Sequence, residues 1–200
     1  ANASVSPNDW SERYNFSAIT MDEGLPHNFI DDIIKDSKGF LWIATNGVGI
    51  ARYDGYEFIP FNMGEPHNKL KSNFIKKLCE DKFKRLWIGS ESGIDIIDLQ
   101  TLQITQINNG NQKFEQLCNS PIHQIYCSKS GNLWLCSKNS LYKIIFSHSG
   151  EVIQTIEVCH LSEKESINTI CEIDESLWFN YRNEICRIKE MSITQQNPTT

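Results

Sequence analysis

Cysteine and histidine are the side chains in this sequence that could bind a metal ion or act as a nucleophile or base. No two cysteines form a Cys-x-x-Cys pair, and no Cys/His group has the spacing of a zinc site. The sequence therefore predicts neither a metal site nor a cofactor. The histidines are scattered, mostly in predicted connections, which favours surface positions. The residues concerned are Cys79, Cys118, Cys127, Cys136, Cys159, Cys171 and Cys186, with His27, His67, His123, His148 and His160.

The cysteines fit small, buried positions better than reactive ones. Cys79 follows Leu78 and Cys171 follows Ile170, so both occupy one position of two similar segments. Free cysteine behaves as a small buried hydrophobe, and we expect mostly structural thiols, with one disulfide as the alternative. The odd count of seven leaves at least one thiol unpaired within the chain, which is uncommon in exported proteins.

Acidic residues and short motifs give no catalytic constellation. The sequence contains no Gly-x-Ser-x-Gly, no His-Glu-x-x-His and no calcium loop. Asp31 and Asp32 are adjacent in a predicted strand, so their side chains point to opposite faces and cannot flank one glycosidic bond. We interpret them as solvated charges and predict no enzymatic activity for this chain.

Composition excludes two classes of partner. The 200 residues carry 19 Lys and Arg against 25 Asp and Glu, a net charge of −6, whereas nonspecific nucleic-acid binders present a basic surface. No apolar run approaches the roughly 20 residues of a membrane span, so no membrane contact is predicted. With 40% hydrophobic residues the chain has an ordinary globular composition.

An internal repeat indicates the fold. Four tryptophans are separated by 45, 47 and 44 residues, and each is preceded by leucine and followed by an apolar residue. Pairs of apolar residues three apart recur upstream, beginning at Ile30, Ile75, Ile122 and Ile167. A repeat of about 45 residues is typical of propeller blades. The repeated tryptophans are Trp42, Trp87, Trp134 and Trp178.

Each unit is predicted to form four short antiparallel strands. In the first unit, β-branched and aromatic segments alternate with turns at Asp36–Gly39, Asn46–Gly49 and Asp54–Gly55. The uninterrupted apolar run Leu41–Ile43 fits a strand that is buried on both faces between neighbouring blades. We therefore predict an all-β fold of four four-stranded β-propeller blades, a fragment of a larger propeller. Four unrelated hairpins in a sandwich are the alternative, but a sandwich needs no tryptophan at a fixed phase.

The repeat divides the chain into expected segments. A strand at 16–24 would be the outermost strand of a preceding blade or would close the ring. The fourth unit is partial, with a weak last strand at 191–194. The expected segments are an N-terminal extension (1–15), the outer strand (16–24), blade 1 (25–66), blade 2 (67–116), blade 3 (117–163), blade 4 (164–194) and a disordered tail (195–200).

The segments Gly24–Ile30, Asp36–Thr45 and Arg52–Gly55 resemble the two-component regulator propeller repeat, and the second unit is similar at Leu70–Ile75 and Leu86–Ser90. Units three and four depart from the pattern. The resemblance implies the periplasmic sensor region of a hybrid two-component histidine kinase that detects carbohydrate-derived signals. It also implies further blades and a kinase domain in the same polypeptide. Unpaired terminal blade faces would favour a homodimer.

Propeller topology places the second hairpin of each blade and the connections between blades on one face. Asn, Ser, His and charged residues gather in these loops, and amides and hydroxyls match the hydroxyls of an oligosaccharide. The alternative is that these residues are polar because loops are solvated. A protein-interaction scaffold and, less favoured, a propeller lyase with a His beside a Glu in the central channel are the rival functions. The candidate ligand-binding residues are His27, Asn46, His67, Glu91, Asn139, Arg182 and Asn183.

Overall fold

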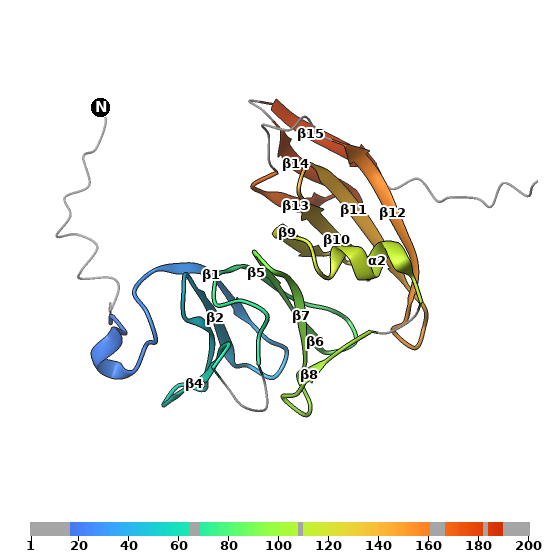
Figure 1. Ribbon diagram of the computed structural model, residues 1–200. Helices are drawn as coiled ribbons and strands as arrows, with labels where there is room; N and C mark the ends of the chain where they lie inside the picture. The colour runs from blue at the N-terminus through green and yellow to red at the C-terminus, as the bar shows by residue number, and fades with distance from the viewer. Residues whose placement is uncertain (1–16, 65–68, 108–109, 161–166, 182–183, 190–200) are drawn as a thin grey trace, which may run out of the picture.

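A computed structural model describes residues 17–64, 69–107, 110–160, 167–181 and 184–189. Within these residues the chain forms four small antiparallel sheets, arranged as four consecutive β-propeller blades, and Figure 1 shows the sheets following one another in chain order around an arc. The predicted all-β propeller fold is confirmed. No helix in the described part of the chain has the length and apolar character needed to cross a membrane.

Every sheet is a simple meander from an inner to an outer strand. Blades 1, 2 and 3 have four strands each, whereas blade 4 has three among the described residues. Its expected last strand, 191–194, lies outside them. The strands are β1 (Ile30–Lys35), β2 (Leu41–Thr45), β3 (Gly49–Tyr53), β4 (Phe58–Phe61), β5 (Ile75–Glu80), β6 (Arg85–Ser90), β7 (Gly93–Asp98), β8 (Ile104–Thr105), β9 (Ile122–Cys127), β10 (Leu133–Ser137), β11 (Ser140–Phe146), β12 (Val152–His160), β13 (Ile170–Ile173), β14 (Ser176–Tyr181) and β15 (Glu184–Lys189).

Two short helices were not predicted. A 3-10 helix, η1 (Met21–Glu23), precedes blade 1, and α2 (Gln112–Leu117) lies in the connection between β8 and β9. The expected strand at 16–24 was wrong, because residues 17–20 form no strand. Instead the Thr20 hydroxyl and the Glu23 carboxylate form a capping box that starts η1, and Gly24 ends it in the left-handed conformation.

Tryptophan from each of the first three blades fills the space before the next blade. Trp42, Trp87 and Trp134 are at most 2% exposed, and each belongs to a separate apolar cluster shared by two consecutive blades. Burial of such a large aromatic side chain is worth about 3–5 kcal/mol when compared with alanine. The repeated Leu-Trp-apolar motif therefore holds neighbouring blades together.

Trp178 and Cys171 differ from their counterparts because no described blade follows blade 4. They are paired across β13 and β14, as Cys79 and Trp87 are across β5 and β6. Yet Trp178 is only half-buried and Cys171 is exposed. The expectation that Cys171 is a buried core thiol was wrong, because the face of blade 4 that carries it lacks a packing partner among the described residues.

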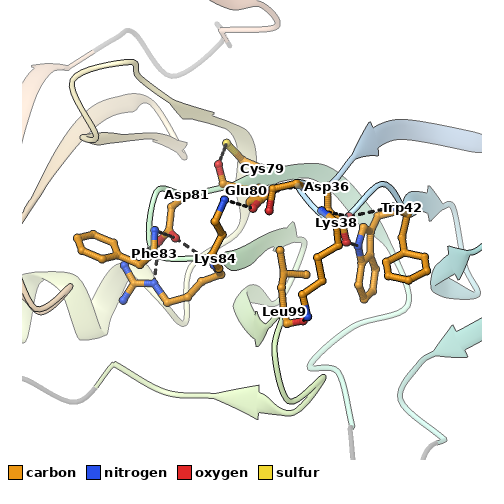
Figure 2. Close-up of polar contacts among 12 residues, drawn as sticks. Asp36, Lys38, Trp42, Cys79, Glu80, Asp81, Phe83, Lys84 and Leu99 are labelled. Atoms are coloured by element: carbon orange, nitrogen blue, oxygen red, sulfur yellow. Dashed lines mark hydrogen bonds and ion pairs between the residues drawn. The ribbon is translucent and has the colours of Figure 1, made fainter.

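A hydrogen bond to aspartate, and not packing alone, fixes the tryptophan in blade 1 and again in blade 2. Oδ2 of Asp36 accepts a hydrogen bond from Nε1 of Trp42 at 2.8 Å, and Oδ1 accepts the backbone N–H groups of Lys38 and Phe40. Figure 2 shows Asp36 and Trp42 pointing toward each other beside the turn. One carboxylate thus closes the first hairpin and satisfies the buried indole.

A second set of contacts joins blades 2 and 4 to the first hairpin turn of the blade before each of them. Oε2 of Glu80 accepts the N–H of Ser37 in blade 1, and Oε2 of Glu172 accepts the N–H of Lys129 in blade 3. Glu80 is registered with Leu86 and Glu172 with Leu177, so the two glutamates are equivalent. Glu172 thus corresponds to Glu80 and not to its neighbour Asp81.

Between blades 2 and 3 a disulfide replaces this glutamate contact. Cys127 holds the position equivalent to Glu80, and it is bonded to Cys79 of blade 2 across a Cα–Cα distance of 6.2 Å. The other five cysteines are free, and Cys136 is fully buried as expected. The expectation of an unpaired core thiol was thus wrong for Cys79, and the alternative of one disulfide is confirmed.

Candidate functional site

The second hairpins of blades 1–3 and the connections between blades form one surface, here called the loop face (turns 46–48, 91–92 and 138–139 with the described parts of 62–74 and 106–121). Its segments are bonded to each other: Gly47 and Gly49 donate to the carbonyl of Asn73, and Ile94 donates to that of Cys118. Gly49 and Gly93 have positive φ, and a Cβ at either would collide with the backbone of the connecting loop. This close approach makes the loop face a rigid surface.

His27 and Asn46 come together at Phe29. Nδ1 of His27 accepts the N–H of Phe29 at 3.1 Å, and the two rings lie 5.4 Å apart. The N–H of Asn46 donates to the carbonyl of Phe29 at 3.1 Å. Phe29 itself is 71% exposed, so its ring is accessible beside the His27 imidazole, while Asn46 is joined to it through the backbone.

Glu91 lies next along this edge, at Phe74. Its N–H donates to the carbonyl of Phe74, and its carboxylate pairs with Lys76 at 3.2 Å. Phe74 is 47% exposed and also forms a bridge with Asn46. The structure therefore brings His27, Asn46 and Glu91 into one row beside two exposed rings, here called the Phe29–Phe74 edge.

Sequence reasoning missed both phenylalanines of this edge. Each lies in an identical Asn-Phe-Ile tripeptide, at residues 28–30 and 73–75. In each, the isoleucine opens the inner strand and the phenylalanine stands just before it. The repeated phenylalanine, at a position outside the blade core, was the signal in the sequence that could have indicated this edge.

The other predicted ligand residues are not joined to this edge. Asn139 lies in the two-residue turn between β10 and β11, in blade 3. His67, Arg182 and Asn183 lie outside the described residues.

The loop face also carries two hollows beside α2. One, of about 680 Å³, lies between α2 and the outer strands of blade 3 and includes Lys113, Ser137, Tyr142 and Glu157. The other, of about 400 Å³, lies against β7 and β8 of blade 2. Neither was anticipated, because α2 was not predicted.

A buried polar group lines the smaller hollow. Asp95 is 4% exposed, and its carboxylate accepts the N–H of Lys71 at 2.9 Å. Burial raises the pKa of Asp95, and the Lys71 N–H and ammonium oppose this. Nζ of Lys71 donates to the carbonyl of Cys118 at 2.7 Å, and burial raises the pKa of the Cys118 thiol to about 11. These contacts tie α2 to blade 2, which gives them a structural role.

Glu157, which lines the larger hollow, contacts a Ser and a His without the geometry of a catalytic triad. The Ser140 hydroxyl donates to Glu157 at 2.7 Å and lies 2.8 Å from Nδ1 of His160, and that same Nδ1 is 3.5 Å from Glu157. A triad histidine uses one ring nitrogen for the nucleophile and the other for the acid. Here a single nitrogen faces both, and β12, which carries Glu157 and His160, is the outermost strand of blade 3 and not part of the central channel.

The described residues contain no cluster of side chains suited to hold a metal ion. Among them, no three His, Cys, Asp or Glu side chains lie close enough together to hold an ion.

Two segments of the repeat match a known protein family. The model of the family "Two component regulator propeller" matches residues 24–47 and 69–92. None of the curated proteins matches the chain. The extracellular domain of the hybrid two component system BT3049 from B. thetaiotaomicron is similar in structure, with a TM-score of 0.66 and 20% identity over 86% of this chain and 25% of that one.

Two further solved structures share the fold. The extracellular domain of BT4673 from B. thetaiotaomicron has a TM-score of 0.52 and 22% identity over 87% of this chain and 30% of that one. Virginiamycin B lyase from Staphylococcus aureus, a catalytically inactive form with quinupristin, has a TM-score of 0.58 and 18% identity over 80% of this chain and 52% of that one. The chain thus spans about a quarter of the BT3049 domain. The two matched segments lie in blades 1 and 2, the same blades in which the sequence resembles the two-component regulator propeller repeat.

Proposed function

We propose that this chain is part of the extracytoplasmic sensor region of a hybrid two-component signalling protein. The match of blades 1 and 2 to the two-component regulator propeller family carries the proposal. The fold that the chain shares with the extracellular domain of one such system, BT3049, supports it. The sensor would lie in the periplasm, with further blades and a histidine kinase in the same polypeptide.

The proposed signal is a carbohydrate bound at the loop face. The Phe29–Phe74 edge supports this, because an exposed aromatic ring can pack against the apolar face of a sugar ring. His27, Asn46 and Glu91 lie along the same edge, and their imidazole, amide and carboxylate groups can exchange hydrogen bonds with sugar hydroxyls. Ligand binding would shift the arrangement of two protomers, and the difference in affinity between the two arrangements would carry the signal to the kinase.

A protein-interaction scaffold is the second candidate. Phe29 and Phe74 are also the apolar contacts that a protein partner would use, since aromatic side chains are enriched at interfaces. The polar groups around them favour a sugar over a flat protein surface. The propeller lyase has less support, because the His160–Glu157 pair lies on an outermost strand.

The test is a signalling assay on the intact polypeptide that contains these blades. Kinase autophosphorylation would be measured in membrane vesicles with and without a panel of oligosaccharides. The expected result is a saccharide-dependent change that Phe29→Ala and Phe74→Ala both reduce. Tyr56→Ala, which removes a ring that is 94% exposed in the turn before β4, is the matched control and should leave the response unchanged. A response that no saccharide alters would contradict the carbohydrate proposal.

A further inference from the structure

The larger hollow beside α2 combines features of a ligand site that packing alone does not explain. Its volume of about 680 Å³ falls within the range of small-molecule pockets. Its walls come from α2, the turn between β10 and β11, and the outer strands of blade 3. The residues that line it are Gln112, Lys113, Glu115, Gln116, Leu117, Asn119, Ser120, Ser137, Lys138, Tyr142 and Glu157.

Ser137, which lines this hollow, differs from the equivalent residues of blades 1 and 2 in its hydrogen bonding. Every blade has a hydroxyl three residues after its tryptophan, and in blades 1 and 2 it is bonded: Thr45 donates to the carbonyl of Gly49 at 2.8 Å, and Ser90 to that of Gly93 at 3.0 Å. Ser137 is 2% exposed, yet its Oγ is buried without a hydrogen-bond partner among the described residues. An unsatisfied buried hydroxyl costs stability and calls for an explanation.

The third strand of blade 3 also opens on a different residue. Blades 1 and 2 have Gly49 and Gly93 there, whereas blade 3 has Ser140, whose own hydroxyl is committed to Glu157 and lies against His160. The Ser137 hydroxyl therefore lacks the acceptor that its counterparts have, although the residue lines the hollow.

The rest of the wall is pre-organised. Glu157 accepts the Ser140 hydroxyl on Oε1 and pairs with Lys113 through Oε2 at 3.3 Å. The Ser140 hydrogen bond and the Lys113 ammonium hold the pKa of Glu157 below its usual range. Lys113 also lies 5.4 Å from the centroid of the Tyr142 ring. These contacts fix a carboxylate, an ammonium and an aromatic ring around the hollow.

Charge and donor type indicate which ligands fit. Two cations, Lys113 and Lys138, stand against two anions, Glu115 and Glu157, so the lining carries no net charge. Gln112 and Gln116 add amides that both donate and accept hydrogen bonds. A neutral molecule rich in hydroxyl groups matches this lining, whereas a charged molecule would leave part of its charge unbalanced.

We propose that the hollow between α2 and blade 3 binds a neutral saccharide unit, with the Ser137 hydroxyl donating to one of its oxygen atoms. The assignment rests on the proposed carbohydrate function and adds both a site and a ligand class to it. It is separate from the Phe29–Phe74 edge, since none of the lining residues belongs to that edge.

Ser137→Ala and Ser90→Ala form a matched pair of test variants, because the two serines hold one repeat position. Removal of the unpaired Ser137 hydroxyl should leave the free energy of unfolding unchanged or raise it, while the affinity for a bound saccharide falls roughly three- to tenfold. Removal of the Ser90 hydroxyl should lower the stability, because a hydrogen bond is lost, and leave the affinity unchanged.

The probes are glucose, galactose, mannose, xylose and their common disaccharides, with glucuronate as the acidic analogue of glucose. Binding to the 200-residue chain would be measured by calorimetry, with urea unfolding of each variant alongside. If a neutral sugar binds and Ser137→Ala binds it equally well, the hollow is not the site, and the sensor proposal stands. Tighter binding of glucuronate than of glucose would contradict the proposal that the ligand is a neutral saccharide. Binding of no probe would overturn this subsite, while the response of the intact polypeptide still tests the sensor proposal separately.

Discussion

Nε1 of Trp87 donates a hydrogen bond across 2.7 Å to Oδ2 of Asp81, and both groups are buried. The same carboxylate accepts the N–H groups of Phe83 and Arg85 and pairs with the Arg85 guanidinium at 2.7 Å. A single side chain thus closes a turn, satisfies a buried indole and neutralises a nearly buried cation.

Asp81→Ala should therefore destabilise the chain by about 3–5 kcal/mol, because it leaves the Arg85 charge without its partner. Urea unfolding followed by circular dichroism would measure the loss. The control is Asp54→Ala, which removes a comparable turn acceptor that lies at the surface and bonds only Tyr56 and Glu57. Equal losses in the two variants would show that Asp81 acts as a turn residue alone.

Blade 3 lacks the aspartate–tryptophan hydrogen bond of blades 1 and 2, and one substitution can introduce it. Ser128 stands where blades 1 and 2 have aspartate, and Nε1 of Trp134 is buried without a hydrogen-bond partner among the described residues. Ser128→Asp should add about 1 kcal/mol to the free energy of unfolding by supplying an acceptor for that indole. Ser128→Asn, which supplies a neutral acceptor, is the comparison. A lower melting temperature for Ser128→Asp would mean that burial of the new charge costs more than the bond returns.

Two aspartates of β7 should respond to pH in opposite directions. Burial raises the pKa of Asp95, so its ionisation costs more in the folded chain than in the unfolded one. This cost is absent below the ordinary aspartate pKa of about 4 and grows as the pH rises through the folded value. Asp95→Asn should therefore gain stability relative to the parent as the pH rises toward neutral.

Asp98 provides the opposite case. The Thr101 and Gln100 N–H groups hold the pKa of Asp98 below its usual range, so its contribution is present at neutral pH and is lost as the pH falls through the folded value. Asp98→Asn should lose stability at neutral pH and match the parent in acid. Urea unfolding of both variants at neutral pH, near pH 4 and well below pH 4 checks the signs, because the contribution of Asp98 is lost only below the ordinary aspartate pKa of about 4. Parallel slopes would contradict the assigned environments.

The thiols should react in an order set by exposure. Without reductant the unfolded chain should show five reactive thiols, and with reductant seven, because Cys79 and Cys127 are bonded. In the folded chain Cys171 should be alkylated first, since it is exposed. Cys118 and Cys136 should be slow, because burial raises both pKa values and little thiolate is present.

Iodoacetamide labelling with peptide mass spectrometry would give both the count and the order. Cys171→Ser should remove the fast phase and leave the rest unchanged. Seven reactive thiols in the unfolded, unreduced chain would exclude the disulfide.

Much of the fold could be predicted because blade structure repeats locally. The phase of Trp42 and its three equivalents, with glycine and aspartate turns between apolar segments, is enough to indicate four-strand meanders. The predicted site fared less well. His27, Asn46 and Glu91 are joined through Phe29 and Phe74 rather than to one another. These two phenylalanines were missed, because hydrophobicity alone does not reveal on which side of a blade a residue lies.

The sequence by itself determined the repeat and its strands, since hydrogen bonds between adjacent strands and burial of the Leu-Trp core depend on residues close in the chain. Only the tertiary structure decided what one blade presents to the next. The equivalence of Glu80, Cys127 and Glu172, the exposure of Cys171 and the unpaired hydroxyl of Ser137 all depend on contacts between distant segments. Such contacts follow from how blades stack in space, and no local pattern encodes which partner a given side chain will meet.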